Sequence, residues 1–272
     1  MNITARTKIC MVIGDPVEHS LSPQMHNAGY AALGIDDQYV YVACHVDVKK
    51  IDDFIIGVRA MRIHGISCTI PHKIAVMPLL DEVESIAKKI GAVNTIVNEK
   101  GKLIGYNTDW LGVLNPLEQR TTLKGKTVAL IGAGGAARAA AFAVVSKDAK
   151  LTVYNRTAEK AEKLAKEFTG EAFSLSEIEN VKSADIIINT TPIGLDETNE
   201  TLIPKKYITD KHVIFDAVYG ISETQLIKDA KKQGAQIIPG IEMLFHQGFA
   251  QFILFTGYEA PAEKMVASLR GV

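Results

Sequence analysis

The chain has 272 residues, 47% of them hydrophobic and 22% charged, a composition typical of a globular protein with two modest domains. Its 30 basic and 31 acidic side chains nearly cancel, which argues against nucleic acid or an anionic membrane as a partner. No apolar run reaches the ~18 residues of a membrane span, and the first residues lack a secretory apolar core. We interpret Cys10, Cys44 and Cys68 as buried free thiols in a reducing cytoplasm.

A strand, a loop and a helix begin the chain. Residues 8–14 form an apolar run that predicts a buried strand, and Pro23 is expected to begin a helix that stops at Gly34. Ser20 and Ser22 lie in the loop between them, where open α/β folds place ligand contacts. Helix capping is an equally good interpretation of these two serines.

The next two predicted strands cover residues 38–46 and 65–71, and an amphipathic helix over 48–62 separates them. Thr69 and Lys73 cluster where the later strand gives way to a helix. This is an unusual place for a lysine that is only solvated. Because most lysines simply lie on the surface, the position alone does not decide between a functional and a surface role for Lys73.

A hairpin precedes the middle of the chain. The charged stretch 81–89 predicts a solvated helix, and 91–97 predicts a strand that turns at a glycine into a second strand over 103–106. This hairpin leads to Asp109, which begins a helix and is either its N-cap or a functional carboxylate. The polar residues 121–126 are expected to form the linker between domains.

A glycine-rich turn then follows a strand and precedes a helix. The apolar residues 127–131 predict a strand buried on both faces. Gly132, Gly134 and Ala137 then fill the three positions of the GxGxxG/A dinucleotide fingerprint. A glycine-rich turn without a ligand would look the same in isolation. Because strand, turn and helix all fall where the motif requires them, we predict a dinucleotide diphosphate on the N-terminus of this helix.

The residues after the next strand favour NADP over NAD. A strand over 151–154 is followed by Asn155, Arg156 and Thr157, roughly 20 residues beyond the glycines, where an NAD site usually has an acidic residue. A guanidinium suits the 2′-phosphate of NADP and has little to bind on a bare hydroxyl. The alternative is that Arg156 is a solvated charge at a strand end.

The alternation of strands and helices continues after this site. Strands are predicted at 185–189, 212–219 and 236–239, with a helix over 222–233, and the pattern is helical beyond Gly240. Such alternation favours a parallel, doubly wound sheet. The last helices have no strands near them in the sequence, so we expect them to return and cover the first domain.

Spaced motifs in this order resemble the shikimate dehydrogenase family, the NADP-dependent shikimate/quinate dehydrogenases. They are HSLSP at 19–23, TIPHK at 69–73, GAVNTI at 91–96, YNTDW at 106–110, GAGGAARA at 132–139, NRT at 155–157, NTTPIG at 189–194, DAVY at 216–219 and GIEMLFHQG at 240–248. The resemblance implies an α/β fold in which residues 1–117, completed by helices in 241–272, bind substrate and residues 122–240 form a Rossmann-type NADP-binding domain. It implies reversible reduction of 3-dehydroshikimate to shikimate in aromatic amino-acid biosynthesis, in the cytoplasm, by a monomer or homodimer.

The resemblance also implies roles for individual residues. Lys73 and Asp109 become the catalytic pair. The substrate would be held by Ser20, Ser22, Thr69, Asn94, Tyr219 and Gln247. NADP would be held by Gly132, Ala133, Gly134, Gly135, Ala136, Asn155, Arg156, Thr157, Thr190 and Gly240. Two alternatives stay open, a quinate/shikimate dehydrogenase of relaxed specificity and a non-catalytic relative that senses NADP(H) or shikimate.

Two residues depart from the expected motifs or lie beside them. Trp110 follows Asp109 where many relatives have glycine, and His246 precedes Gln247. Because large aromatic side chains mostly serve cores, we expect Trp110 to pack rather than to act in chemistry. We interpret His246 as a core or rim residue and assign it no part in the mechanism.

Overall fold

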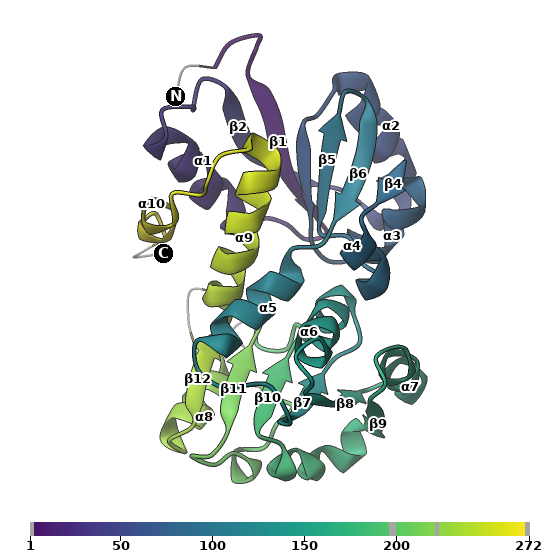
Figure 1. The fold of residues 1–272 in the computed structure, drawn as a ribbon, viewed down its shortest axis with the longest axis vertical. Helices are drawn as coiled ribbons and strands as arrows, with labels where there is room; N and C mark the ends of the chain where they lie inside the picture. Colours follow the sequence, from purple (N-terminus) through teal and green to yellow (C-terminus); the bar gives the residue numbers. More distant parts are fainter. Residues whose placement is uncertain (1–2, 196–199, 221–222, 270–272) are drawn as a thin grey trace. The chain divides into compact units, whose positions relative to one another are not determined.

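The computed structural model of the protein describes residues 3–195, 200–220 and 223–269 (Figure 1). Its contacts divide the chain into two compact units. The first unit comprises residues 1–108 and 247–272, and the second comprises 109–246. The first residue of the helix predicted over 222–233 and residues 270–272 of the C-terminal segment lie outside the described residues.

The sheet of the first unit is mixed. Its strand order is β2-β1-β3-β5-β6-β4, where β1 pairs in parallel with β2 and β3, and β5 runs antiparallel to β3 and β6. The predicted hairpin is confirmed, and Lys100 and Gly101 both have positive φ at its turn. The strands are β1 Lys8–Gly14, β2 Tyr39–His45, β3 Gly65–Cys68, β4 Glu82–Val83, β5 Thr95–Glu99 and β6 Lys102–Tyr106.

The helices of this unit differ from the prediction in one place. The helix predicted over 81–89 is wrong in its first part, because Glu82–Val83 pairs with β6 as an edge strand. Glu84 then caps the shorter helix by accepting hydrogen bonds from Ile86 N and Ala87 N. The helices of the N-terminal segment are α1 Ser22–Ala32, α2 Ile51–Met61, α3 His72–Ala75 and α4 Ser85–Ile90, with 3-10 turns η1 Val48–Lys50 and η2 Met77–Leu79.

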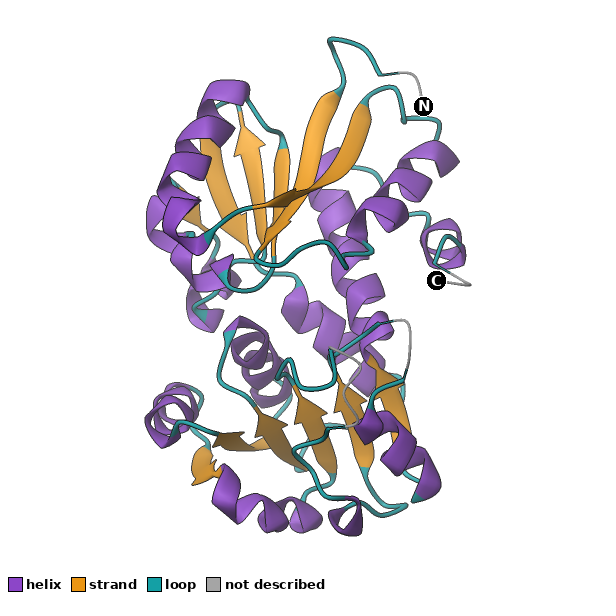
Figure 2. Cartoon of the chain, turned by 180° about the vertical axis from the view of Figure 1, so that it is seen from behind, coloured by secondary structure: helices purple, strands orange, loops and turns teal. Residues whose placement is uncertain are grey.

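The sheet of the second unit is entirely parallel among the described residues, with strand order β12-β11-β10-β7-β8-β9 (Figure 2). The prediction of a parallel, doubly wound sheet is therefore confirmed. The edge strand β9 was not predicted, because its four residues carry no continuous apolar run. The strands are β7 Thr127–Ile131, β8 Lys150–Asn155, β9 Glu171–Ser174, β10 Ile186–Asn189, β11 Val213–Asp216 and β12 Gln236–Pro239.

Helices cover this parallel sheet, and one more helix carries the chain back to the first unit. Residues 121–126, predicted as a linker, lie within the second unit. The helix α9, Gly240–Thr256, contains the boundary at 246/247, and α10, Ala262–Ala267, packs on α1. The remaining elements are α5 Asp109–Glu118, α6 Gly135–Val145, α7 Ala158–Glu167 and α8 Gln225–Lys232, with 3-10 turns η3 Leu175–Ser183 and η4 Lys205–Tyr207.

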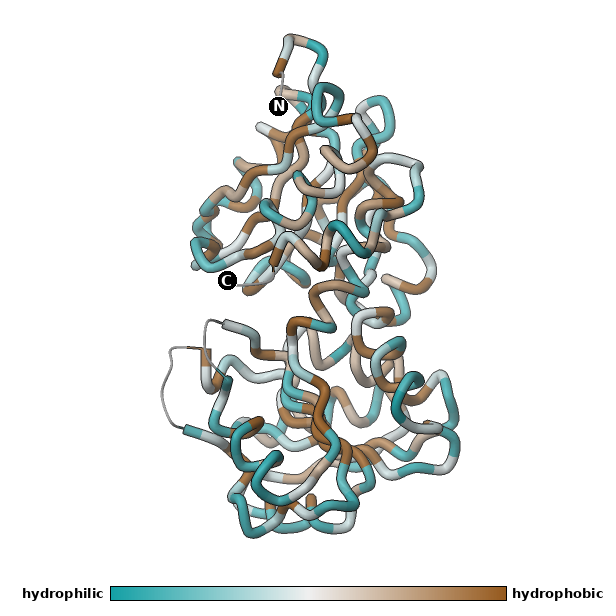
Figure 3. The backbone as a smooth tube through the Cα atoms, turned by 90° about the vertical axis from the view of Figure 1, so that its left-hand side faces the viewer, coloured by the Kyte–Doolittle hydropathy of each residue, from teal (hydrophilic) through white to brown (hydrophobic). Residues whose placement is uncertain are grey.

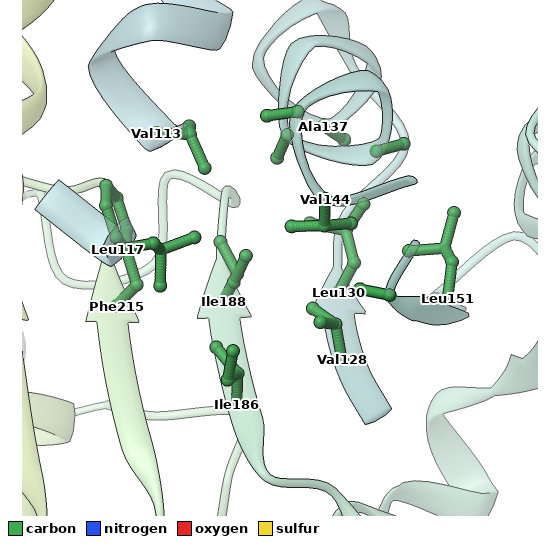
Figure 4. Packing of buried hydrophobic residues seen from close by; sticks show 14 of the residues in the cluster. Val113, Leu117, Val128, Leu130, Ala137, Val144, Leu151, Ile186, Ile188 and Phe215 are labelled. Carbon is green, nitrogen blue, oxygen red and sulfur yellow. The ribbon is translucent and has the colours of Figure 1, made fainter. Parts of the chain in front are cut away.

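Side chains of the central strand β7 alternate between two cores. Val128 and Leu130 pack with α5 and α6 on one face (Figure 4), and Ala129 and Ile131 pack on the other face among residues that include Leu226 of α8. A strand covered on both faces must be apolar at successive positions, which is why this run is continuous rather than alternating. Hydrophobic stretches accordingly concentrate inside each unit, whereas the surface loops are mainly hydrophilic (Figure 3).

Aromatic rings and two glycines hold α9 against the first unit. His26 of α1 stacks on Tyr41 with ring centroids 4.4 Å apart. A Cβ at Gly65 would lie 2.4 Å from the Phe255 ring, so glycine permits the close approach of this ring, and one at Gly248 would require the Met25 side chain to move. None of the described helices is long and apolar enough to cross a membrane.

The three cysteines are free, and they differ in exposure. Cys10 and Cys68 are buried as predicted, but Cys44 near the end of the edge strand β2 is partly exposed. The prediction that all three are buried is therefore wrong for Cys44. An edge strand has one side without a neighbouring strand, which explains the exposure.

Candidate active site

The strand ends of the first unit bring its candidate residues to one edge of the sheet. The parallel strands β1 and β3 both end at this edge, and the antiparallel β5 begins there because Ser67 pairs with Thr95. Thr95 also pairs with Tyr106, so β6 ends at the same edge. The segments around 69–73, 94 and 107–108 therefore lie at one edge of the sheet, although they are far apart in the sequence. Residues 20–22 lie where the chain passes from β1 into α1.

The two serines lie at the start of α1. Ser22 is the first residue of the helix and is buried, whereas Ser20 is partly exposed. The Ser22 N–H donates to Ser20 Oγ at the long distance of 3.4 Å, and the N-cap residue is Leu21, which has no capping side chain. Capping therefore accounts for only this one weak contact.

Lys73 lies in the short helix α3 that follows β3. The Thr69 N–H donates to Ile13 O of β1 at 2.9 Å, which fixes the segment between β3 and the helix. The Lys73 carbonyl in turn accepts from Val93 N at 2.8 Å, so the lysine backbone is bonded to the residue that precedes Asn94. The side chain of Lys73 is partly buried.

Asn94 is the centre of a buried polar cluster. It is 1% exposed, and its Oδ1 accepts from the Thr108 N–H at 2.7 Å and from Thr95 Oγ1 at 2.8 Å. Its Nδ2 donates to Thr108 Oγ1 at 2.9 Å and to Gln247 Oε1 of α9 at 3.4 Å. Asn94 and Gln247, both predicted to bind substrate, are thus held together by a direct contact.

In the second unit the glycine turn is fixed by the strands on both sides of β7. The Gly132 N–H donates to Tyr154 O of β8 at 2.8 Å. On the other side, Ile131 O accepts from the N–H and the hydroxyl of Thr190, at 2.9 and 2.8 Å. The turn is thereby tied to the ends of β8 and β10.

The two fingerprint glycines have different surroundings. Gly132 has φ of +116°, and a Cβ there would lie 2.5 Å from Thr190 Oγ1. At Gly134 nothing lies within 4 Å of the position that a Cβ would occupy, directly before the first residue of α6. A dinucleotide needs a close backbone approach at this second glycine and N–H groups at the helix N-terminus, so the turn fits a diphosphate.

Arg156 comes directly after the last residue of β8, the strand that neighbours β7. It is exposed, as is Thr157, and Asn155 Nδ2 donates to Thr157 O at 3.0 Å. In the described part of the chain no carboxylate lies within ion-pair distance of the Arg156 guanidinium. An uncompensated guanidinium at this point suits a phosphate.

A second buried polar group, which sequence reasoning missed, joins the ends of β10 and β11. Asp216 is fully buried and accepts from Asn189 Nδ2 at 2.9 Å, from Thr224 Oγ1 at 2.5 Å and from Val218 N at 3.2 Å. Burial raises the pKa of its carboxyl group, and the hydrogen bonds from Thr224 and Asn189 oppose the rise. The sequence feature that could have revealed this group is a polar residue at the end of each of two apolar strands, Asn189 at the end of β10 and Asp216 at the end of β11.

Tyr219 and Asp109 belong to the second unit. Burial raises the pKa of Tyr219 to about 12, and the negative charge of Asp109 adds to the rise. Asp109 is itself buried and is the first residue of α5. At the start of α9, a Cβ at Gly240 would lie 2.5 Å from Val218 O, so this glycine packs closely against the segment that carries Tyr219.

The predicted site residues thus fall into two sets. The first unit contains Ser20, Ser22, Thr69, Lys73, Asn94 and Gln247, and the second contains Asp109, Tyr219 and the predicted cofactor residues. Sequence reasoning missed Thr95, Thr108 and Gln251 around Asn94. Gln251 could have been found, because it lies four residues after Gln247 on the same face of a helix.

Trp110 and His246, which the sequence analysis left outside the mechanism, both have contacts within the second unit. Trp110 packs edge-on against Phe142 of α6, with ring centroids 5.7 Å apart. His246 Nδ1 lies 3.5 Å from Asn115 Nδ2, and burial, followed by the charge of Arg120, lowers its pKa. Both side chains serve packing and hydrogen bonding between helices of this unit.

Comparisons with known proteins identify the family. Three family models match in succession: the shikimate dehydrogenase substrate binding domain over residues 12–96, shikimate / quinate 5-dehydrogenase over 116–220 and the shikimate 5′-dehydrogenase C-terminal domain over 240–270. A shikimate dehydrogenase (NADP(+)) from Methanosphaera stadtmanae is 42% identical over 284 residues, which cover 99% of this chain and all of that relative. The chain belongs to the shikimate dehydrogenase family. The resemblance seen in the motifs is confirmed.

Solved structures of family members share the whole fold. A crystal structure of shikimate dehydrogenase from Aquifex aeolicus has a TM-score of 0.92 and 40% identity, and the match covers 98% of this chain and 99% of that one. The Thermus thermophilus enzyme, solved in complex with NADP(H) and shikimate, has a TM-score of 0.88 and 34% identity, with coverage of 96% and 98%. The α/β class with a substrate-binding unit and a Rossmann-type unit is therefore a property of the family as well as of this chain.

Proposed function

We propose that the chain is an NADP-dependent shikimate dehydrogenase that reversibly reduces 3-dehydroshikimate to shikimate. The observation that carries the proposal is the buried cluster around Asn94, in which side-chain amides and hydroxyls gather beside the helix that bears Lys73. Such a cluster suits a polyhydroxylated ring. The Thermus thermophilus relative, solved with NADP(H) and shikimate, supports the same assignment.

Substrate recognition follows from the chemistry of these groups. Thr69, Asn94 and Gln247 would hydrogen-bond the ring hydroxyls, while Ser20 and Ser22, helped by Tyr219, would bind the carboxylate. An analogue that lacks a hydroxyl would deprive the site of a hydrogen bond that the substrate supplies, in surroundings from which water is largely excluded. This penalty rejects such analogues more strongly than a change in apolar shape would.

Lys73 and Asp109 are proposed to move and control one proton at the substrate oxygen. As the carbonyl is reduced, negative charge develops on its oxygen, and the Lys73 ammonium would donate a proton to it. In the direction of oxidation the neutral amine would accept the same proton. Asp109 would orient the lysine and bind a ring hydroxyl.

NADP supplies the hydride chemistry by exchanging a hydride between its nicotinamide ring and the substrate carbon. Residues of this chain bind and orient it. The segment 132–136 would hold the diphosphate, Asn155, Arg156 and Thr157 would surround the 2′-phosphate, and Thr190 and Gly240 would also contact the cofactor. The fit at the glycine turn supports this set, because Gly134 leaves space in front of the helix N-terminus.

In this proposal residues 1–117 with 241–272 form the substrate domain, and 122–240 form the NADP domain. The enzyme would work in the cytoplasm on a small molecule, as a monomer or homodimer and without nucleic acid. Three free cysteines agree with a reducing compartment.

A turnover assay with four substrate pairs tests the proposal. Purified protein is given shikimate or quinate with NADP or NAD, and reduction is followed at the absorbance band of reduced nicotinamide. Rapid turnover with shikimate and NADP, and slow turnover with the other pairs, is the expected result. Comparable rates with quinate would assign the broader enzyme instead. NADP binding without turnover of any pair would indicate a sensor.

A further inference from the structure

The hydrogen bonds behind Asn94 form one directed chain. Tyr41 OH donates to Ser67 Oγ at 2.6 Å, and Ser67 Oγ donates to Gln251 Oε1 at 2.9 Å. The other end of the Gln251 amide donates from Nε2 to Thr95 Oγ1 at 2.9 Å. Thr95 Oγ1 then donates to Asn94 Oδ1 at 2.8 Å. The chain runs from the edge strand β2 to the centre of the candidate substrate site.

Two backbone groups decide which way the amides face. The Asn94 carbonyl can only accept, so the end of the Gln251 amide that faces it, at 3.2 Å, must be the nitrogen. The Thr108 N–H can only donate, so the end of the Asn94 amide that faces it, at 2.7 Å, must be the oxygen. A flip of either amide would oppose two donors or two acceptors. The direction of the chain is thus required by the chemistry of the backbone.

The orientation of the Asn94 amide also fixes the orientation of the Gln247 amide. Because Asn94 Oδ1 faces Thr95 and the Thr108 N–H, its Nδ2 faces Gln247 and donates to Oε1. The Gln247 oxygen is therefore turned toward Asn94, and its terminal nitrogen is the end that can donate to a hydroxyl oxygen of the substrate. The donor pattern of the site is set by residues that do not contact the substrate themselves.

Burial makes this arrangement stiff. Thr95 is fully buried, and Gln251 and Tyr41 are each 1% exposed. In such surroundings water cannot replace a lost hydrogen-bond partner. Removing one side chain of the chain therefore leaves the polar atom that it bonded buried and unsatisfied, at the full desolvation cost of that atom. Gln251 also shares the α9 face of Gln247, one helical turn away, so the same helix carries a proposed substrate contact and its support.

We propose that Thr95 and Gln251 are positioning residues that fix the side-chain amide of Asn94 and, through its contact with Gln247, hold the Gln247 amide in the orientation that receives a ring hydroxyl of the substrate. The assignment rests on the proposed function, since it concerns how the same site selects its substrate. It predicts that changing the Thr95 hydroxyl weakens substrate binding while leaving NADP binding as it was.

Thr95→Val and Thr95→Ser are the test pair. Valine has nearly the same shape and lacks the hydroxyl that joins Gln251 to Asn94, whereas serine keeps it. With the full-length protein, titration calorimetry would measure the Kd of shikimate and of NADP separately, and steady-state assays would give kcat and KM. For Thr95→Val we expect the Kd of shikimate to rise about five- to tenfold, with the Kd of NADP and kcat within about twofold of wild type. Thr95→Ser should bind shikimate within about twofold of wild type.

The outcomes separate this inference from the proposed function. Wild-type protein that neither binds nor oxidises shikimate would refute the proposed function and the inference with it. Active wild type with an unchanged shikimate Kd in Thr95→Val would refute only the positioning role, as would equal losses for shikimate and NADP. If Thr95→Val does not fold, Gln251→Leu replaces it. A rise in the shikimate Kd of about threefold or more in that variant supports the role, and a smaller one overturns it.

Discussion

The two units present different groups at the strand ends where their candidate sites lie. In the first unit, the strand ends carry side-chain amides and hydroxyls that are buried and bonded to one another around Asn94. In the second unit, they carry a glycine turn with space before a helix N-terminus and an exposed arginine. A ring with several hydroxyls is recognised by side chains whose directions are fixed in advance. A diphosphate is recognised by backbone N–H groups and charge, which need room rather than rigid side chains.

The largest effect is expected at Lys73, where the first unit would contribute chemistry as well as binding. Lys73→Ala should lower kcat by about 10²-fold or more and leave the Kd of shikimate within a few fold, because it removes the proton donor and acceptor. Lys73→Arg is the matched control. It keeps the charge but cannot release its proton near neutral pH, so it should be as slow as alanine in shikimate oxidation. Near-normal turnover of either variant would remove Lys73 from this role.

Two substitutions in the glycine turn are expected to affect different quantities, one the stability of the protein and the other its affinity for NADP. Gly132→Ala adds a Cβ at positive φ, 2.5 Å from Thr190 Oγ1, and should lower the free energy of unfolding by about 1–3 kcal/mol. Gly134→Ala meets no atom within 4 Å, so it should fold nearly normally yet raise the Kd of NADP by about tenfold or more. Urea denaturation and NADP titration of both variants measure the two quantities. An unchanged NADP Kd in Gly134→Ala would contradict a diphosphate at this turn.

Arg156 tests the choice between the two dinucleotides. Arg156→Ala should raise the Kd of NADP by about tenfold, because a charge-assisted contact to the 2′-phosphate is lost, and should leave the weaker binding of NAD unchanged. Arg156→Lys should fall between wild type and alanine, since it keeps the charge without the bidentate geometry. Equal changes for NADP and NAD would show that the arginine does not contact the 2′-phosphate.

The last prediction concerns stability rather than ligand binding, and it belongs to the first unit alone. His26 is fully buried, and burial lowers its pKa from 6.5 to about 3. Below pH 6.5 the unfolded chain binds a proton that the folded chain cannot accept, so the free energy of unfolding falls by up to about 1.4 kcal/mol per pH unit until pH 3. Urea denaturation at pH 7 and pH 5 should show a smaller loss for His26→Gln than for wild type. Identical losses would mean that His26 does not titrate as described.

The sequence predicted the second unit in more detail than the first. The continuous apolar run before Gly132 and the residues after β8 are local signals, and both lie where the fingerprint requires them. The cluster around Asn94 depends instead on an antiparallel hairpin that places Thr108 and Asn94 side by side, 14 positions apart. Hydrogen bonds of this kind have no sequence signature. Thr95 and Thr108 were therefore missed, whereas Asn94 and Gln247 were found through the family resemblance.

The division of ligands between the two units can be measured by titrating wild type, Gln247→Ala and Arg156→Ala with shikimate and, separately, with NADP. Gln247→Ala should raise the Kd of shikimate about tenfold with the Kd of NADP within about twofold, and Arg156→Ala should do the reverse. Variants that weaken both ligands equally, or wild-type protein that fails to bind shikimate, would contradict the assignment of Gln247 to the substrate and of Arg156 to NADP.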